Sequence, residues 1–254
     1  MPPEALSLAA LRPDWPARSN VGALMSTRLG GVSAAPFDSL NLGRSGGDAP
    51  AAIDENRRRF AAALDGARPV WLSQVHGARV LRLRADAMPA AREADAAIAT
   101  EPGLACTVMV ADCLPVLFAA PDGRGVGAAH AGWRGLAGGV LEASVAALCD
   151  AAACAPRDLL AWLGPCIGPR QFEVGAEVVE ACGGDSRFLA RPRADGSMRW
   201  LADLPGLARD RLRAAGLTQI SGGELCTVEN ASRFFSFRRD RVTGRMAAAV
   251  WLRA

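Results

Sequence analysis

The chain has 254 residues and a mass of 26.4 kDa, which fits one large domain, or two small ones that share a core. Half of the residues are hydrophobic and 22% are charged, which excludes a disordered chain. The net charge of +3 is too small to indicate nucleic-acid binding. No apolar run approaches the roughly 18 residues of a membrane-spanning helix, and the N-terminus lacks the features of a signal peptide. We therefore expect a cytoplasmic protein without membrane or nucleic-acid partners.

The first 45 residues are rich in residue types that are typical of turns, and they show few features of strands. Residues 1–20 are expected to form an N-terminal extension on the surface, followed by a single catalytic domain at residues 21–254. Two loop segments come next, at residues 27–33 and 37–43. Loops carry functional residues more often than buried cores do, so both segments are candidates for a site.

Helices and strands alternate along the rest of the chain. Apolar residues at helical spacing predict helices over residues 48–64, 135–148, 172–182 and 203–214, with Asp48 and Asp203 as N-terminal caps. Apolar runs predict strands over residues 70–75, 79–83, 104–110, 115–119, 125–130, 159–163, 225–228 and 246–252. Several strands join through short turns, which favours a mixed or antiparallel sheet over a doubly wound parallel one. The predicted fold class is α+β, a single domain with a β-sandwich core flanked by helices.

Three segments combine a metal-capable side chain with Gly or Pro at a predicted strand end. They are Gln74-Val75-His76-Gly77, Ala111-Asp112-Cys113-Leu114-Pro115 and Ala129-His130-Ala131-Gly132-Trp133-Arg134-Gly135. The chain has only two His residues, and its seven Cys are an odd number that does not indicate a disulfide framework. Strand ends at one edge of a sheet can converge from distant parts of the sequence. His76, Cys113 and His130 are therefore candidate metal ligands.

Two imidazoles and one thiolate form a ligand set that suits catalytic zinc. Three protein ligands leave the fourth position for water, whose pKa zinc lowers from about 15.7 to about 7. The spacing by itself also fits unrelated packing, or a nucleophilic pair of Cys113 and His130. Zinc held in a closed site by a fourth ligand, such as Cys106, Cys166 or Asp112, would instead indicate a module without turnover.

Each of the other polar residues has a functional and a structural interpretation. Arg28 and Arg134 lie beside Gly, where a guanidinium and the backbone can hold a phosphate, but an exposed surface Arg is the commoner case. Asp112 and Glu173 are candidates for moving a proton, although a carboxylate at a helix N-terminus also explains Glu173.

Six motifs together resemble the YfiH family, also called the multicopper polyphenol oxidase or laccase-domain family. They are residues 27–33, the three segments above, Gly164-Pro165-Cys166-Ile167-Gly168, and Phe234-Phe235-Ser236-Phe237-Arg238-Arg239-Asp240. The match runs in order from about residue 21 to the C-terminus. Phe237 stands where relatives often carry Tyr, so a role for a Tyr hydroxyl is not expected here.

The resemblance implies a zinc-dependent purine nucleoside phosphorylase that also deaminates adenosine. Its implied substrates are phosphate with adenosine, inosine, guanosine or S-methyl-5′-thioadenosine. The implied zinc ligands are His76, Cys113 and His130, with copper as a metal accepted in vitro. The phosphate or substrate residue that the resemblance implies is Arg28. Arg134 is our own further candidate for this role, and Asp112 is our candidate catalytic carboxylate.

Two alternatives stay open and one is disfavoured. Some family members are described as peptidoglycan editing factors, which implies a zinc amidase acting on cell-wall precursors. A hydrolase with Cys113 as nucleophile would be blocked by thiol alkylation and indifferent to zinc. A laccase-like oxidase needs several coppers and many His ligands, which two His residues cannot supply. The chain is expected to be a monomer or a homodimer.

Overall fold

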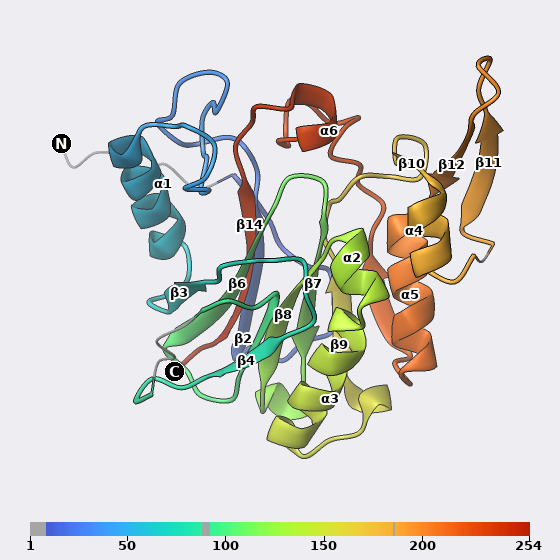
Figure 1. The fold of residues 1–254 in the computed structure, drawn as a ribbon. Helices are drawn as coiled ribbons and strands as arrows, with labels where there is room; N and C mark the ends of the chain where they lie inside the picture. The colour runs from blue at the N-terminus through green and yellow to red at the C-terminus, as the bar shows by residue number, and fades with distance from the viewer. Residues whose placement is uncertain (1–8, 88–91, 185) are drawn as a thin grey trace.

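Two large β-sheets stacked face to face form the centre of the structure, a computed structural model that describes residues 9–87, 92–184 and 186–254 (Figure 1). The first sheet has the strand order β1 (Ala10–Leu11), β2 (Val21–Ser26), β14 (Met246–Leu252), β6 (Leu104–Val110) and β3 (Arg68–Trp71). The second has the order β13 (Gln219–Gly222), β9 (Leu160–Leu163), β7 (Leu114–Ala119), β8 (Val126–Ala131), β5 (Ala96–Ala99) and β4 (Val80–Leu83).

Most neighbouring strands in these two sheets run antiparallel. The parallel pairs are β3 with β6, β4 with β5, and β9 with β13. Both sheets are therefore mixed, and neither closes into a barrel. This confirms the predicted fold class, α+β with a mixed or antiparallel sandwich core.

The main core lies between the two sheets. Val108 and Val250 of the first sheet belong to one buried cluster with Leu117 and Ala128 of the second. Every residue of β7 and β8 is buried, because these strands are covered on both faces. Strands of this kind have continuous apolar sequences, which is why the sequence predicted them well.

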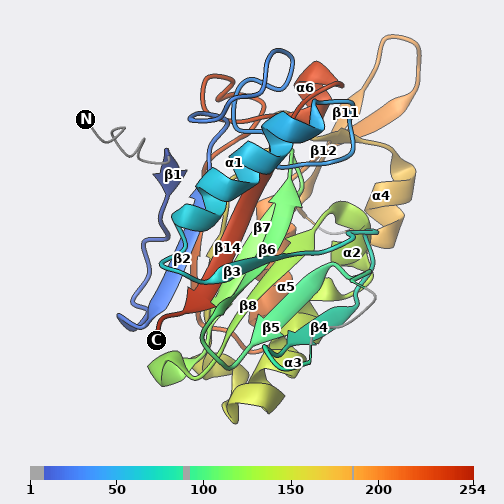
Figure 2. The ribbon, with the colours of Figure 1, turned by 90° about the vertical axis from the view of Figure 1, so that its left-hand side faces the viewer.

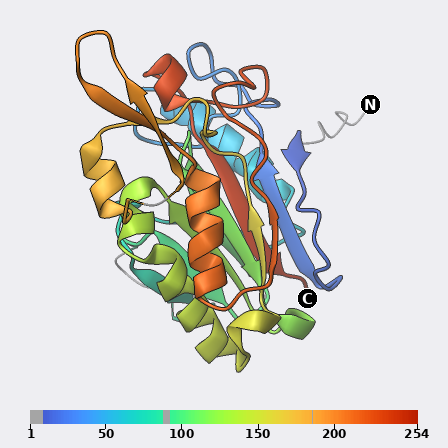
Figure 3. The ribbon, with the colours of Figure 1, turned by 90° about the vertical axis from the view of Figure 1, so that its right-hand side faces the viewer.

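Helices cover the outer face of each sheet. Helix α1 (Pro50–Ala62) crosses the first sheet (Figure 2) and buries Phe60 against Trp251 and Leu24. Helices α3 (Val140–Ala152) and α5 (Leu204–Ala214) cover the second sheet (Figure 3), with Leu148 and Leu212 in its outer core. The molecule thus has four layers, a helix, two sheets and a second helical layer.

A smaller sheet and three short helices lie at one end of the sandwich. The sheet has the order β10 (Glu173–Val174), β12 (Met198–Ala202) and β11 (Phe188–Pro192), and β11 and β12 form a hairpin that projects from the body (Figure 1). The short helices are α2 (Trp133–Ala137), α4 (Ala176–Ala181) and α6 (Phe237–Asp240). Single 3-10 turns are formed by Pro121–Gly123 and Pro156–Asp158.

Several helix predictions are wrong in detail. The helix predicted over residues 135–148 is two helices, because Gly139 takes a left-handed φ of 88° between α2 and α3. The helix predicted over residues 172–182 begins as β10 and becomes helical only at Ala176. Asp48 does not cap α1, whose N-cap is Ala49, and its carboxylate accepts hydrogen bonds from Ser33 and Asn41 instead.

Several strand predictions are wrong too. Strand β2 lies in the segment that was expected to be loop, and all its residues are buried. Strand β5 and the hairpin of β11 and β12 were not predicted. No strand forms over residues 225–228. There the backbone of Cys226 forms one isolated parallel β-bridge with the backbone of Cys166. The segments of β2 and β5 are rich in Gly, Ala or Ser, with the sequences VGALMS and AAIA, and small residues of this kind give only a weak strand signal.

The predicted N-terminal extension is described only from residue 9 onward. Ala10 and Leu11 pair with Met25 and Ser26 at the edge of the first sheet. The boundary at residue 20 stays a prediction. Among the described residues, no helix is long and apolar enough to cross a membrane.

Candidate metal centre

His76 lies in the loop after β3 and is held there by Asp95. Its φ is 61°, in the left-handed region, which is uncommon for residues other than Gly. The backbone N–H of His76 donates to Oδ1 of Asp95 at 2.9 Å, while those of Val75 and Gly77 donate to Oδ2 at 3.1 and 2.8 Å. One buried carboxylate therefore folds this loop and turns the exposed imidazole toward the site.

Cys113 lies in the tight connection between β6 and β7. The preceding residue, Asp112, has a left-handed φ of 98° and is buried. Its Oδ1 accepts a hydrogen bond from the hydroxyl of Thr227, and its Oδ2 accepts one from the backbone N–H of Arg238, both at 2.6 Å. Asp112 thus fastens the Cys113 turn to the C-terminal part of the chain.

His130 projects from β8 and is almost completely buried. Its Nδ1 lies 2.8 Å from Oδ1 of Asp95. A carboxylate can only accept, so Nδ1 carries the proton and Nε2 remains the metal-binding nitrogen. The backbone N–H of His130 also donates to the carbonyl of Asp95 at 2.7 Å.

The three predicted ligands converge as the sequence indicated. One donor atom from each of His76, Cys113 and His130 lies within 4.8 Å of the other two, and Sγ of Cys113 is 3.8 Å from Nε2 of His76. Gly132 leaves room for them, because a Cβ there would lie 2.8 Å from the His76 ring and 2.9 Å from Sγ. Two imidazoles and a thiolate at these separations fit zinc, which bonds N at about 2.0–2.1 Å and S at about 2.3 Å.

The electrostatics of the site favour a thiolate. Burial raises the pKa of the Cys113 thiol, but the charge of His130 and hydrogen bonds from both imidazoles outweigh burial and lower it to about 6. Burial lowers the pKa of His130, but the Cys113 thiolate and the Asp95 carboxylate outweigh it and raise the pKa to about 9. Without metal the pair is a thiolate and an imidazolium, and a bound metal would release the imidazolium proton.

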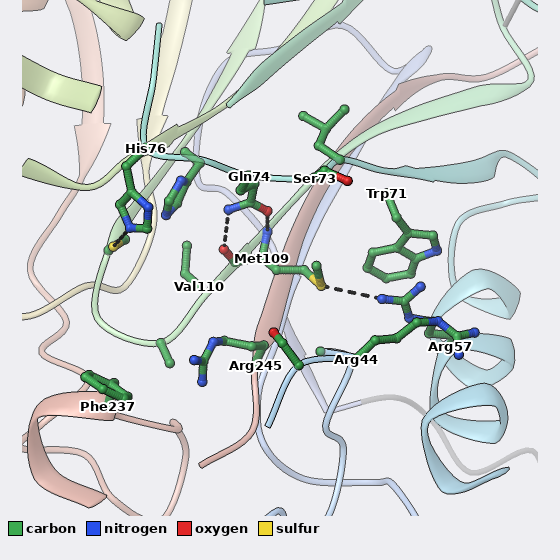
Figure 4. Close-up of a pocket in the computed structure, with 16 residues that line it drawn as sticks. Arg44, Arg57, Trp71, Ser73, Gln74, His76, Met109, Val110, Phe237 and Arg245 are labelled. Atoms are coloured by element: carbon green, nitrogen blue, oxygen red, sulfur yellow. Dashed lines mark hydrogen bonds between the residues drawn. The ribbon is translucent and has the colours of Figure 1, made fainter. Parts of the chain in front are cut away.

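The three ligands open into a cavity of about 650 Å³. Its other lining residues include Trp71, Gln74, Phe237 and Arg245 (Figure 4). Gln74 is fixed across the cavity wall, where its Nε2 donates to the carbonyl of Met109 at 2.8 Å and its Oε1 accepts the Met109 N–H at 2.7 Å. A cavity of this size is typical of small-molecule sites.

Arg28 and Arg134 do not line this cavity. The Arg28 guanidinium pairs with Asp38, donates to the carbonyls of Asp38 and Ala231, and stacks on the Phe235 ring. Arg134 is exposed and stacks on Trp133, with 4.1 Å from Cζ to the ring centroid. Their predicted phosphate contacts stay predictions.

Asp95 and Arg245 are site residues that the motifs of the sequence do not include. Asp95 is a charged residue inside the apolar run Ala94–Ala99, and it is completely buried. A lone carboxylate in an apolar strand is a usable signal, because buried charges need partners. Arg245 carries no comparable signal, since it precedes β14 by one residue and its place depends on the fold. Glu173, a weaker candidate, pairs with Arg193 and lies outside the metal cavity.

The sandwich fold and the His–Cys–His cluster define a protein with residues able to hold one metal ion at an open cavity. The chain belongs to the family whose model is described as multi-copper polyphenol oxidoreductase laccase, which matches residues 22–253. It is similar to the purine nucleoside phosphorylase YfiH of Escherichia coli (strain K12), with 51% identity over 94% of this chain and 97% of that protein.

Two further relatives support this membership. A purine nucleoside phosphorylase of Pseudomonas aeruginosa is 51% identical, over 96% of this chain and 98% of that protein. The crystal structure of a Neisseria meningitidis protein is 43% identical and superposes with a TM-score of 0.88, covering 97% of this chain and all of that chain. Both fold and family therefore extend over nearly the whole chain.

Proposed function

We propose that this protein is a zinc-dependent purine nucleoside phosphorylase that also deaminates adenosine. The observation that carries the proposal is the three-donor cluster of His76, Cys113 and His130 at a cavity of about 650 Å³. Relatives at 41–51% identity over at least 94% of this chain are named purine nucleoside phosphorylases. The proposed substrates are phosphate with adenosine, inosine, guanosine or S-methyl-5′-thioadenosine.

Zinc fits the donor set better than a multicopper centre does. The whole chain has two His, whereas a trinuclear copper cluster needs many. Among the described residues, no fourth His, Cys, Asp or Glu joins the group, so a catalytic site is favoured over a closed structural one. Bound there, zinc would supply a Lewis acid and a water of lowered pKa.

In phosphorolysis the protein has to bind two substrates and exclude water. One oxygen of hydrogen phosphate forms a bond to C1′ of the ribose. The bond from C1′ to N9 breaks, its electron pair goes to the base, and the phosphate proton ends on the purine. The exposed ring of Phe237 offers the cavity a flat apolar face for a purine or ribose.

In deamination water replaces the amino group at C6 of adenine, and a proton must reach the departing ammonia. Asp112 is our candidate to carry it, although it does not line the cavity and lies next to the ligand Cys113. Both its carboxylate oxygens accept hydrogen bonds, from Thr227 and Arg238, so a proton transfer requires one of these bonds to break. An Asp112→Asn variant that keeps its zinc and still forms inosine would remove Asp112 from this role.

A product assay tests the proposal. Full-length protein with its zinc content measured is incubated with adenosine, with and without phosphate, and the products are separated by chromatography. Adenine that appears only with phosphate supports phosphorolysis, and inosine without phosphate supports deamination. Neither product from zinc-loaded protein would overturn the proposal and leave the cell-wall precursor amidase as the next candidate.

The place of the protein in the cell and its state as monomer or homodimer stay predictions of the sequence. The proposed partners are small molecules.

A further inference from the structure

The cavity beside the metal ligands carries a strong excess of positive charge. The described residues that line it include three arginines, Arg44, Arg57 and Arg245, and no Asp or Glu. Arg44 pairs with Asp54 at the surface. Among the described residues, neither Arg57 nor Arg245 has a carboxylate partner within salt-bridge distance. The charges of Cys113 and Asp112 act on Arg245 without a salt bridge, so its partly buried guanidinium can still take an anion as a direct partner.

Arg245 is the arginine placed next to the reacting end of the cavity. In Figure 4 its guanidinium extends toward the side where His76, Val110 and Phe237 lie, whereas Arg57 lies with Trp71 on the opposite side. The Arg57 guanidinium stacks on the Trp71 ring, 4.2 Å from its centroid, and its Nε donates to the carbonyl of Leu42. Arg57 therefore faces the far end.

The backbone holds Arg245 in place before any ligand binds. Its N–H donates to Oδ1 of Asn41 at 2.8 Å, and this oxygen also accepts the N–H of Gly43 at 2.9 Å. Gly43 leaves the path for the arginine stem, because a Cβ there would lie 2.6 Å from Cγ of Arg245. The loop at residues 37–43, which the sequence predicts only as a turn, thus positions the Arg245 side chain.

The guanidinium of Arg245 has donors left for a ligand. Nη1 donates to the carbonyls of Thr243 and Gly244 at 3.0 and 3.1 Å, and among the described residues Nε and Nη2 have no hydrogen-bond acceptor within reach. Burial lowers the pKa of Arg245 below its ordinary value, but an arginine keeps its charge at neutral pH. Two free donors in one plane match two oxygens of a phosphate.

We propose that Arg245 binds the inorganic phosphate of phosphorolysis in the cavity that holds His76, Cys113 and His130. The inference rests on the proposed function, and it names the phosphate residue. A nucleoside is uncharged, so phosphate is the substrate that needs this charge. A nucleotide offers the same phosphate chemistry, and the experiment separates the two sources.

The test compares Arg245→Gln and Arg245→Lys with Arg241→Gln as matched control. Arg241 stacks on the same Phe237 ring at the same 5.9 Å as Arg245 but is exposed and lies outside the metal cavity. Zinc-loaded full-length variants are titrated with inorganic phosphate and, separately, with AMP by calorimetry. The KM values for phosphate and nucleoside are measured alongside.

Arg245→Gln is expected to raise the Kd and KM for phosphate about 10- to 100-fold, the usual range for hydrogen bonds to a charged group. The KM for nucleoside should stay within about threefold, Arg245→Lys should recover part of the affinity, and Arg241→Gln should match the wild type. Wild-type phosphate affinity in a folded, zinc-loaded Arg245→Gln variant would overturn the inference. So would a loss confined to AMP, which would assign the site to a nucleotide.

A second variant and a second measurement keep the test decisive. If Arg245→Gln does not fold, Gly43→Ala displaces the arginine stem and should weaken phosphate binding in the same direction; unchanged binding there counts against Arg245. If the wild type forms no sugar phosphate, the proposed function fails by that result alone, while calorimetry still decides whether Arg245 binds phosphate.

Discussion

Asp95 joins two of the three metal-capable residues through one carboxylate. It accepts the N–H groups of the His76 loop and the Nδ1–H of His130. Its pKa is lowered, because hydrogen bonds from His130 and from the backbone of Gly77 and Val75 outweigh the effect of burial. Partners of this kind fix the tautomer and the direction of a metal-binding His.

Replacing Asp95 with Asn should weaken zinc binding about 10- to 100-fold, the range seen when such partners are removed. The Asn amide cannot accept from all these donors at once and favours the wrong His130 tautomer. The measurement is zinc affinity by competition with a chromophoric chelator. Asp86→Asn, which removes an exposed carboxylate that pairs with Arg84, is the control. Wild-type zinc affinity in Asp95→Asn would contradict the prediction.

Cys113 should be the most reactive thiol of the metal-free protein. Its pKa of about 6 makes it a thiolate at pH 7, whereas burial raises the pKa of Cys149 to about 11. Cys106, Cys166, Cys182 and Cys226 are buried, and Cys154 is half-buried.

Iodoacetamide should therefore modify Cys113 first, with a rate that rises as the pH increases through about 6 and then levels off, since the thiolate fraction does the same. Mass spectrometry of peptides measures this, and bound zinc should suppress it. Alkylation that zinc leaves unchanged would place Cys113 outside the metal centre and favour a Cys-nucleophile hydrolase.

At the scale of elements, strand register decides which residues meet. Strand β5 pairs antiparallel with β8, with Ala96 opposite Ala129. The next residues along, Asp95 and His130, are therefore neighbours although they are 35 positions apart. No local apolar pattern predicts β5, so the sequence does not indicate a carboxylate beside His130.

Helix α5 was predicted correctly, because its signals are local. Asp203 is its N-cap and accepts the N–H of Gly206 at 2.9 Å, and Pro205 lies in its first turn. The error at residues 135–148 has the opposite origin, since Gly138 and Gly139 interrupt an apolar pattern that by itself reads as one helix.

Asp203→Ala should lower the free energy of unfolding by about 1 kcal/mol, the usual contribution of an N-cap. For a chain of this size the melting temperature should fall by about 2–4 °C. Asp203→Asn keeps the cap but removes the charge that pairs with Arg187, so it should stay close to the wild type in calorimetry. Equal losses in both variants would assign the effect to the ion pair.

At the scale of the whole molecule, a metal would join three segments of the sandwich that are far apart in the sequence. His76 follows β3 of the first sheet, Cys113 lies between β6 and β7 of different sheets, and His130 lies on β8. A ligand that binds only the folded state stabilises it by mass action.

Zinc should therefore raise the melting temperature on the order of 10 °C when it is present at about a thousand times its Kd. Scanning fluorimetry with and without a chelator measures the shift. His76→Ala removes one ligand and should show almost no shift and neither proposed activity. The same shift in His76→Ala would contradict binding at this site.

The sequence by itself determined the fold class, the buried strands β6, β7, β8 and β14, and the identity of the three metal-capable residues. These follow from local apolar patterns and from rare residue types, such as two His in 254 residues. Only the tertiary structure decided that Asp95 holds His76 and His130, that Asp112 is engaged by Thr227 and Arg238, and that Arg245 faces the cavity. Those contacts join positions from 19 to 204 apart. They depend on strand order and register, which no local pattern specifies.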